Sequence, residues 1–521
     1  MECFMNLINK TKCAAATAFV FFGVILAGGA HAANVRVKPG DDFVSAMTKA
    51  SAGDTVFFES GTYKVPYTAG KANTITLSKS GTAEKPIVFY AAGHATAVID
   101  FQFPELTYVD KGVGVSLTGS YYEFHGLAIT RAGYQGAYVT GSYNKFYNMS
   151  FFENRNSGLE INKGGNHTLV VNVDAYRNYD PKKKGGMADG FASKQTQGAG
   201  NVFINCRAWE NSDDGFDFYD SPDSVIVYDS WAFRNGVNVF GYAAELFDGN
   251  GNGFKMGGNK AQANHRCTRC IAFDNPVKGF DQNNNTGGIT VEQSIGYRNG
   301  SSGAANFGMG GTLNAGQKHH LRNNISYKSK NADSFGSSSE QKTNSWNVSV
   351  TVNDADFESL DTSLATVSRN ADGSLPYTKL FRLKKGSDLI DKGADIGFDY
   401  VGSAPDLGPY EYDEKVAESS SSNASSSSSD ASSSSSSVVA SSSSSAKSSS
   451  SVVESSSSIA ESSSSEIVSS SSELESSSSV ATTEIRRRVV PAGVRKEAPR
   501  FNALGRSVKS AEPFRWSISW F

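Results

Sequence analysis

The stretch ENSDDGFDFYDS, at residues 210–221, concentrates carboxylates: it places Asp213, Asp214, Asp217 and Asp220 within eight residues. Like charges this close repel one another, and burying them without partners is costly. The stretch is therefore either a solvated acidic turn or a site that receives a cation. The choice depends on which other side chains the fold brings to it.

A repeated phrase surrounds this stretch and indicates the fold. Each copy opens with an apolar or aromatic pair, reaches an asparagine and then takes a glycine–apolar step, as in AWENSDDGFDF and AFDNPVKGFDQ. The anchoring asparagines are Asn154, Asn178, Asn211, Asn235, Asn275 and Asn299. Their spacings of 24, 33, 24, 40 and 24 residues indicate a basic period of 24 with insertions in two coils. Alternating strands such as NVFINCRAWEN and SVIVYDSWAFRN complete a pattern typical of an all-β solenoid, the parallel β-helix.

The N-terminal end of this solenoid has a predicted cap. A short helix is expected from about residue 42 to residue 50, followed by the strand TVFFES. Such a helix would cover the open end of the solenoid, where backbone edges are otherwise exposed. Within the solenoid, equivalent residues of neighbouring coils lie about 4.8 Å apart. The anchoring asparagines should therefore stack in a hydrogen-bonded ladder.

Alignment of the coils on the glycine–phenylalanine step predicts which side chains meet. The position before glycine holds Asp189 and Asp214 in neighbouring coils, and the position two after glycine holds Asp217 and Lys255. Together with Asp213, the three aspartates should converge on one patch. Oxygen ligands in this number suit Ca²⁺ better than Zn²⁺. For any single Asp–Lys contact, the alternative is a surface salt bridge in a polar ladder. The phenylalanines of this step predict an inward aromatic stack of Phe191, Phe216, Phe254 and Phe280.

Other charged residues near the cluster fit no column of this alignment. Asp220 and Asp223 are interpreted as solvated. Three further aspartates also fall outside the patch, namely Asp174, Asp180 and Asp248. Four lysines lie close in sequence to Asp189 and either bind substrate or are solvated: Lys182, Lys183, Lys184 and Lys194.

Over roughly residues 33–412 the sequence resembles polysaccharide lyase family 9, the secreted right-handed β-helix pectate lyases. The resemblance is sharpest over ADGFASK, NSDDGFDFYDS and GNGFKMGG. It implies a right-handed β-helix and polygalacturonate as substrate, cleaved by β-elimination to 4,5-unsaturated oligogalacturonides. It also implies a Ca²⁺ site and a catalytic base, carried by Asp189, Asp213, Asp214 and Asp217 for the metal and by Lys255 for the base.

The chemistry of pectate accounts for these residue types. Its C5 proton is weakly acidic, so removal requires a base and a cation that neutralises the adjacent carboxylate. Lysine can act as that base only when neutral, which favours alkaline pH. The alternatives are a lyase on another uronic-acid polysaccharide such as rhamnogalacturonan, alginate or a glycosaminoglycan, a glycoside hydrolase, and a non-catalytic carbohydrate-binding protein. A hydrolase would need two carboxylates flanking the bond, which the crowded cluster does not favour.

The flanking segments predict a secreted protein with four parts. Residues 1–32 read as a signal peptide, with Lys10 and Lys12 before an apolar run and a cleavage site between Ala32 and Ala33. The pectate lyase domain is predicted at 33–413, and no membrane span remains after cleavage. A Ser-rich linker at 414–484 cannot bury a core and is expected to be disordered. The basic tail at 485–521 is a cell-surface, sorting or polyanion-binding segment, or an unstructured solubilising tail.

Composition limits the remaining possibilities. The formal net charge of the 521 residues is −3, which gives no case for nucleic-acid binding, and we expect a monomer. Cys206, Cys267 and Cys270 remain after signal removal. The pair in CTRC resembles half of a zinc site, but no second pair exists. These cysteines are therefore packing residues or form one local disulfide.

Overall fold

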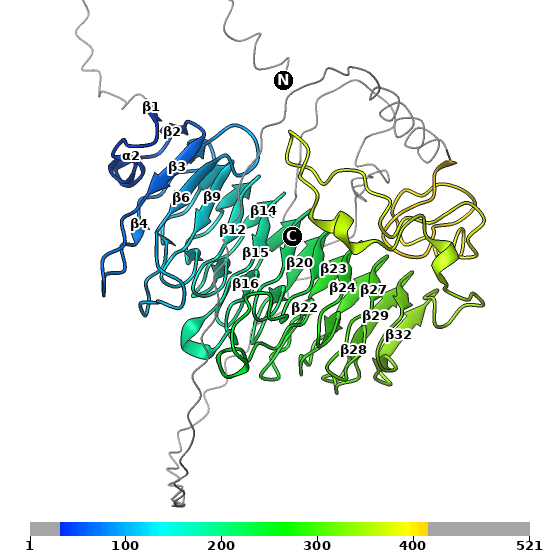
Figure 1. Cartoon of the computed structure of the whole chain (residues 1–521). Coiled ribbons are helices and arrows are strands. Elements are labelled where there is room, and N and C mark those ends of the chain that lie inside the picture. The colour runs from blue at the N-terminus through cyan, green and yellow to red at the C-terminus, as the bar shows by residue number, and fades with distance from the viewer. Residues whose placement is uncertain (1–31, 415–521) are drawn as a thin grey trace, which may run out of the picture. The chain divides into compact units, whose positions relative to one another are not determined.

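The computed structural model describes residues 32–414, which form a parallel β-helix (Figure 1). Three parallel sheets run along it, and successive coils contribute one strand to each sheet in turn. The predicted fold class is therefore confirmed for these residues. Apart from their edge residues, the predicted signal peptide and linker lie outside the described residues, as does the whole basic tail.

The three sheets are named A, B and C. Sheet A contains β1 (Asn34–Val37), β2 (Thr55–Phe58), β5 (Ile87–Tyr90), β8 (Tyr122–His125), β11 (Lys145–Tyr147), β14 (Leu169–Val171), β17 (Asn201–Ile204), β20 (Val225–Tyr228), β23 (Arg266–Thr268), β26 (Thr290–Glu292), β29 (His319–Arg322) and β32 (Ser339–Lys342). Sheet B contains β3 (Gly61–Lys64), β6 (Ala97–Asp100), β9 (Leu127–Thr130), β12 (Ser150–Phe152), β15 (Asp174–Tyr176), β18 (Arg207–Trp209), β21 (Trp231–Phe233), β24 (Ile271–Phe273), β27 (Ile295–Tyr297) and β30 (Ile325–Tyr327). Sheet C contains β4 (Ile75–Leu77), β7 (Val115–Leu117), β10 (Ala137–Val139), β13 (Leu159–Ile161), β16 (Phe191–Ser193), β19 (Phe216–Asp217), β22 (Phe254–Lys255), β25 (Phe280–Asp281), β28 (Phe307–Met309) and β31 (Ser334–Phe335).

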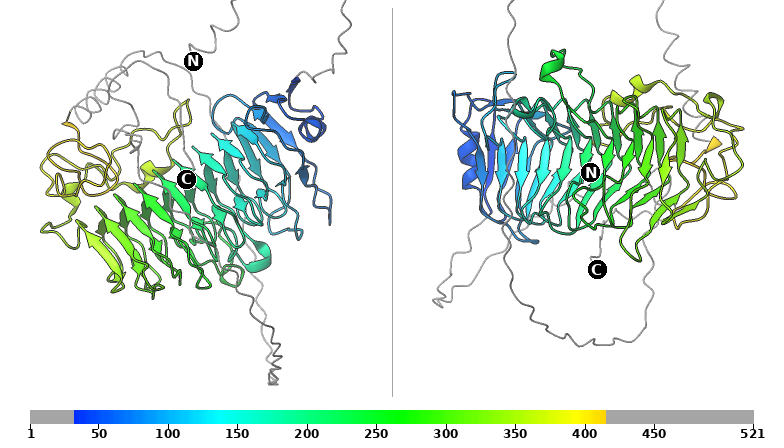
Figure 2. Two further views of the ribbon diagram at one scale, coloured as in Figure 1. Left: turned by 180° about the vertical axis from the view of Figure 1, so that it is seen from behind. Right: turned by 90° about the horizontal axis from the view of Figure 1, so that it is seen from below.

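The predicted capping helix is present as α2 (Phe43–Lys49) at the N-terminal end of the stack (Figure 2). Asp42 caps it, since its side chain accepts a hydrogen bond of 3.0 Å from the backbone N–H of Ser45. Phe43 and Met47 are buried in the same core as the first strands. The helix therefore closes the core where the first coil has no preceding neighbour. Four short 3₁₀ segments also occur within residues 32–414, namely η1 (Pro181–Lys183), η2 (Ala244–Leu246), η3 (Asp354–Asp356) and η4 (Thr362–Thr366).

Two ladders inside the solenoid hold the coils in register, and both were predicted. The phenylalanines of sheet C stack with ring centroids 4.8–5.1 Å apart from Phe191 to Phe307, and all are fully buried. The anchoring asparagines donate from each side-chain amide to the next side-chain carbonyl, as from Asn178 to Asn211 at 2.8 Å and from Asn211 to Asn235 at 2.9 Å. Because each amide also donates to a backbone carbonyl, the ladder satisfies buried polar groups at the corner of every coil it crosses.

The structure corrects the predicted length of the strands. NVFINCRAWEN is two strands, β17 and β18, and SVIVYDSWAFRN is likewise β20 and β21. The corners lie at Asn205 and Asp229, whose φ angles of 56° and 51° turn the backbone into the left-handed region. Asn and Asp tolerate this region better than other side chains, so the chain passes there from sheet A to sheet B.

A segment after the last coil covers the outer face of sheet B, drawn in yellow in Figure 1. Phe357 and Leu380 pack there on outward apolar side chains such as Phe273 and Ile295. An ion triad also fastens this segment, because the buried carboxylate of Asp174 pairs at 2.7 Å with both Arg207 and Arg369. Sheet B is therefore covered on both faces over these coils.

The three cysteines within residues 32–414 are buried and unpaired, so the packing alternative is correct and no local disulfide is present. Cys267 lies 3.6 Å from the thioether sulfur of Met256. In the same part of the chain, no helix is long and apolar enough to cross a bilayer.

Candidate active site

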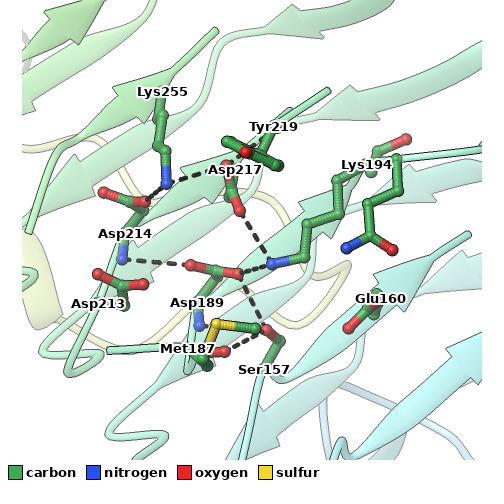
Figure 3. Close-up of polar contacts among 12 residues, drawn as sticks. Ser157, Glu160, Met187, Asp189, Lys194, Asp213, Asp214, Asp217, Tyr219 and Lys255 are labelled. Carbon is green, nitrogen blue, oxygen red and sulfur yellow. Dashed lines mark hydrogen bonds and ion pairs between the residues drawn. The ribbon is translucent and has the colours of Figure 1, made fainter. Parts of the chain in front are cut away.

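The predicted site residues come from three adjacent strands of sheet C (Figure 3). Asp189 precedes β16, Asp213 and Asp214 precede β19, and Asp217 ends β19. Lys255 ends β22 and pairs in register with Asp217, as predicted. Asp189 and Asp214 are also neighbours, since the backbone N–H of Asp214 donates to Asp189 Oδ1 at 3.4 Å.

Three of the four predicted carboxylates form a compact group. One oxygen each of Asp189, Asp214 and Asp217 lies within 4.8 Å of the others, and all three side chains are buried. Asp213 is buried beside them, but its Oδ1 accepts the backbone N–H of Asn250 at 3.0 Å and it is not part of the group. Its assignment as a ligand stays a prediction.

Lys255 reaches back from its coil to the carboxylates. Its Nζ lies 2.9 Å from Asp214 Oδ2 and 3.5 Å from Asp217 Oδ1. It also lies 5.5 Å from the ring centroid of Tyr219, whose side chain is partly exposed. The ammonium is therefore held at the rim of the cluster, between buried acid groups and an accessible aromatic ring.

Lys194 is part of the cluster, which the sequence did not reveal. Its Nζ bridges Asp189 Oδ2 at 2.7 Å and Asp217 Oδ2 at 2.9 Å, and only 7% of its side chain is exposed. The suggestion that it is solvated is wrong. Ala192 lies in register between Glu160 of the preceding coil and Asp217 of the following coil. Because the alanine side chain is small, the long side chain of Lys194 has room to cross this position. Lys182, Lys183 and Lys184 are exposed, and Lys182 pairs with Asp110 at 2.7 Å.

Neighbouring polar groups fix the carboxylates. Ser157 donates its hydroxyl to Asp189 Oδ2 at 3.0 Å. Asn252 donates both its backbone N–H and its side-chain amide to Asp214 Oδ1, each at 2.8 Å. The stretch at 237–252 belongs to the long 40-residue spacing between Asn235 and Asn275. It therefore ends on the cluster, with Asn250 on Asp213 and Asn252 on Asp214.

Burial and crowding shift the acid groups. Burial raises the pKa of Asp189 to about 7, and it also raises the pKa values of Asp213 and Asp214. Burial acts in the same sense on Asp217, but Lys194 and Lys255 outweigh it and hold that pKa below its ordinary value. Asp189, Asp213 and Asp214 therefore take up protons more readily than exposed carboxylates do, whereas Asp217 keeps its charge.

The two lysines shift in the opposite direction from isolated buried lysines. Burial alone would lower the pKa of Lys194, but Asp189 and Asp217 outweigh it and raise the pKa well above its ordinary range. Burial likewise opposes the charge on Lys255, and Asp214 and Asp217 again raise its pKa. Both ammonium groups are therefore charged as long as the surrounding carboxylates keep their charge.

Three of the five aspartates predicted to lie outside the patch have partners elsewhere. Asp220 accepts a hydrogen bond from the Asn259 side chain at 3.2 Å, away from the cluster. Asp180 caps η1 by accepting from the backbone N–H groups of Lys182 and Lys183. Asp174 belongs to the ion triad on sheet B.

Comparison with known proteins identifies the family. Residues 24–331 match the family described as "Pel9A-like, right handed beta helix region". This chain belongs to that family. The right-handed β-helix and the membership implied by the resemblance to polysaccharide lyase family 9 are therefore confirmed.

Relatives of this Pel9A-like chain carry consistent names. Pectate lyase L of Dickeya chrysanthemi is 53% identical over 370 residues, which cover 71% of this chain and 85% of that protein. Pectate lyase PEL9 of Emericella nidulans is 30% identical over 381 residues, covering 67% of this chain and 88% of that protein. The crystal structure of pectate lyase Pel9A shares 50% identity and a TM-score of 0.69, covering 74% of this chain and 98% of that one. The prediction that the chain is an enzyme of the polysaccharide lyase class is confirmed.

Proposed function

We propose that this protein is a Ca²⁺-dependent pectate lyase that cleaves polygalacturonate by β-elimination. The observation that carries the proposal is the position of Lys255, whose ammonium lies 2.9 Å from Asp214 at the rim of a buried carboxylate group. The pectate lyases among its relatives support the choice of substrate.

The carboxylate group fits a divalent cation. Asp189, Asp214 and Asp217 offer hard oxygen ligands within 4.8 Å of one another, which suits Ca²⁺. When ionised, the four aspartates of the cluster carry four negative charges and its two lysines carry two positive charges. The two remaining negative charges are balanced by one divalent cation. Asp213 is the proposed fourth ligand. When bound there, Ca²⁺ would neutralise a uronate carboxylate and the aspartate charges that otherwise hold Lys255 protonated.

The residues of the chain account for the remaining chemistry. In its neutral form, Lys255 accepts the C5 proton of the uronate. The electron pair of the C5–H bond becomes the C4–C5 double bond, the C4–O bond breaks, and the departing oxygen takes up a proton. The Tyr219 ring, 5.5 Å from the lysine nitrogen, borders the accessible side of this position. Because only the neutral amine is basic, the rate should rise with pH.

The decisive experiment follows the absorbance of unsaturated uronates on polygalacturonate, with Ca²⁺ and with a chelator. Lys255→Arg is the sharpest variant, because arginine keeps the positive charge but does not deprotonate. It should lose product formation by at least about a thousandfold, within the usual range for a missing acid–base group. Lys328→Met is the control. That lysine directly follows β30 of sheet B and pairs with Asp354 of η3 rather than with the cluster. Activity of Lys255→Arg near the wild-type level would overturn the base assignment.

A second substrate is favoured by one observation. A solved rhamnogalacturonan lyase shares 25% identity and a TM-score of 0.56, covering 68% of this chain and 97% of that one. A panel of polygalacturonate, rhamnogalacturonan and alginate, assayed by the same absorbance, decides between these substrates. New reducing ends without absorbance would indicate a hydrolase, and binding without cleavage would indicate a carbohydrate-binding protein.

We further propose that the protein is exported and that residues 1–32 are removed. The support is the signal-peptide pattern in the sequence, with cleavage between Ala32 and Ala33. N-terminal sequencing of protein collected outside the cells tests this, and a retained Met1 would contradict it.

A further inference from the structure

A third lysine lies on the face of sheet C that carries the site, one coil beyond Lys255. Lys278 occupies the same position before glycine as Asp214 and Asn252. Its backbone N–H donates to the Asn252 side chain at 3.2 Å, and Asn252 in turn donates to Asp214. Hydrogen bonds therefore connect this lysine to the carboxylate cluster through one intervening residue.

The Lys278 side chain lies along the sheet rather than extending into solvent. A Cβ atom added at Gly308 would meet its Cδ at 2.4 Å and its Cε at 2.8 Å, so the missing side chain of that glycine is what makes room for the lysine stem. Gly308 pairs in register with Asp281, and Asp281 pairs with Lys255. The stem thus crosses the outward column that contains the base.

A carboxylate orients the ammonium of Lys278 without using all of its hydrogen-bond donors. It pairs with Asp281 Oδ1 at 2.9 Å, while 35% of the lysine side chain remains exposed. Asp281 is itself buried and fixed, because the same oxygen accepts the backbone N–H of Asn283 at 2.9 Å. An ammonium group has three N–H donors, so donors remain for a ligand arriving from solvent.

We propose that Lys278 binds the carboxylate of a second uronate, further along the polymer than the one that is cleaved, and so selects for de-esterified stretches of the polymer. The inference rests on the proposed function. Neighbouring coils lie about 4.8 Å apart along the axis, a spacing on the scale of a single sugar ring. Lys278 lies on the second coil after Asp214 and Asp217, about 9.6 Å along the axis, so a polymer that crosses the strands of sheet C with one carboxylate at the aspartates and its C5 at Lys255 can bring the carboxylate of a later sugar over the coil of Lys278. An ammonium–carboxylate hydrogen bond is charge-assisted, and a neutral methyl ester does not replace it.

The test compares Lys278→Met, Lys278→Arg and the control Lys328→Met. Methionine keeps the stem over Gly308 but removes the charge, and Lys328 makes a similar ion pair with Asp354 outside sheet C. For polygalacturonate, Lys278→Met should raise KM about tenfold with kcat within about twofold, as for one lost charge-assisted hydrogen bond. Lys278→Arg should retain most of the affinity. On polymers of increasing methyl esterification, the wild-type advantage over Lys278→Met should shrink toward none.

A binding measurement separates this inference from the proposed catalytic function. In a Lys255→Ala background with Ca²⁺, calorimetry with oligogalacturonates of increasing length should show the Lys278→Met defect only for oligomers long enough to reach the additional coil. This measurement tests the binding role of Lys278 even if the protein cleaves no polymer. An unchanged KM, a defect equal on esterified and free polymer, or an equal loss in Lys328→Met would overturn the proposal.

Discussion

Lys194 offers the sharpest test of the charge balance in the cluster. Its ammonium bridges Asp189 and Asp217 at 2.7 and 2.9 Å, and the exposed fractions of these side chains are 7%, 0% and 3%. Lys194→Met keeps the unbranched stem and removes the charge. Breaking a buried ion pair by removing one partner costs about 3–5 kcal/mol, because the remaining charge is left without compensation. We expect that loss in the metal-free protein.

Two conditions should reduce the loss. Ca²⁺ would bring two positive charges to the cluster and leave fewer carboxylate charges uncompensated, so the deficit should shrink to about 1–2 kcal/mol. Acid should also reduce it, because the pKa of Asp189, which burial raises to about 7, allows this carboxyl to become neutral. The deficit should therefore be larger near pH 8 than near pH 5.5.

Urea unfolding, in chelator and in Ca²⁺ at both pH values, measures these differences. Lys328→Met is the control, since its exposed pair with Asp354 should be worth only about 0–1 kcal/mol whether or not Ca²⁺ is present. A deficit for Lys194→Met below about 1 kcal/mol in chelator, or one that is equal in chelator and in Ca²⁺, would refute the reasoning.

Four further predictions follow from buried polar groups. Asp189, with its pKa raised to about 7 by burial, must lose a proton to bind metal, so the Ca²⁺ Kd by calorimetry should rise about tenfold from pH 8 to pH 6; a constant Kd would contradict this. The same raised pKa means that the stability this group contributes to the metal-free fold is present in acid and is lost as pH rises through about 7. Asn211→Ala leaves ladder partners on both sides unpaired and should cost about 3 kcal/mol in urea unfolding, whereas the exposed Asn370→Ala should cost little. Asp174→Asn should loosen the segment over sheet B, detected as faster hydrogen exchange around Phe357, because Arg207 and Arg369 lose their buried partner; unchanged exchange there would argue against the ion triad as the fastener.

The sequence was sufficient to predict those parts of the site that repeat with the coil. In a parallel solenoid, side chains at equivalent positions stack, so aligning one motif places Asp189 beside Asp214 and Asp217 beside Lys255. The same argument gave the phenylalanine stack and the asparagine ladder. Each is a consequence of register, which needs no knowledge of side-chain conformation.

Features that do not repeat escaped this reasoning. Lys194 lies four residues after the aligned glycine, outside the two columns that were compared, and its bridging position depends on a side-chain path across a space that Ala192 leaves open. A small residue in an outward column of larger ones was the available signal. The donors Asn250 and Asn252 come from the end of an insertion whose course no repeat specifies. The position of Lys278 over sheet C likewise depends on Gly308, a single missing Cβ one coil away.

The position of the cluster in the middle of the ladders explains how so many like charges remain close together. Asn211, two residues before Asp213, is hydrogen-bonded to the coils before and after it. Phe216, between Asp214 and Asp217, stacks on both neighbouring rings at 5.0 and 4.8 Å. Repulsion among the carboxylates therefore cannot be relieved by moving the backbone without breaking ladder contacts in both directions. It must be relieved by protonation or by bound cations, and for this reason the fold itself makes the cluster a receptor for positive charge.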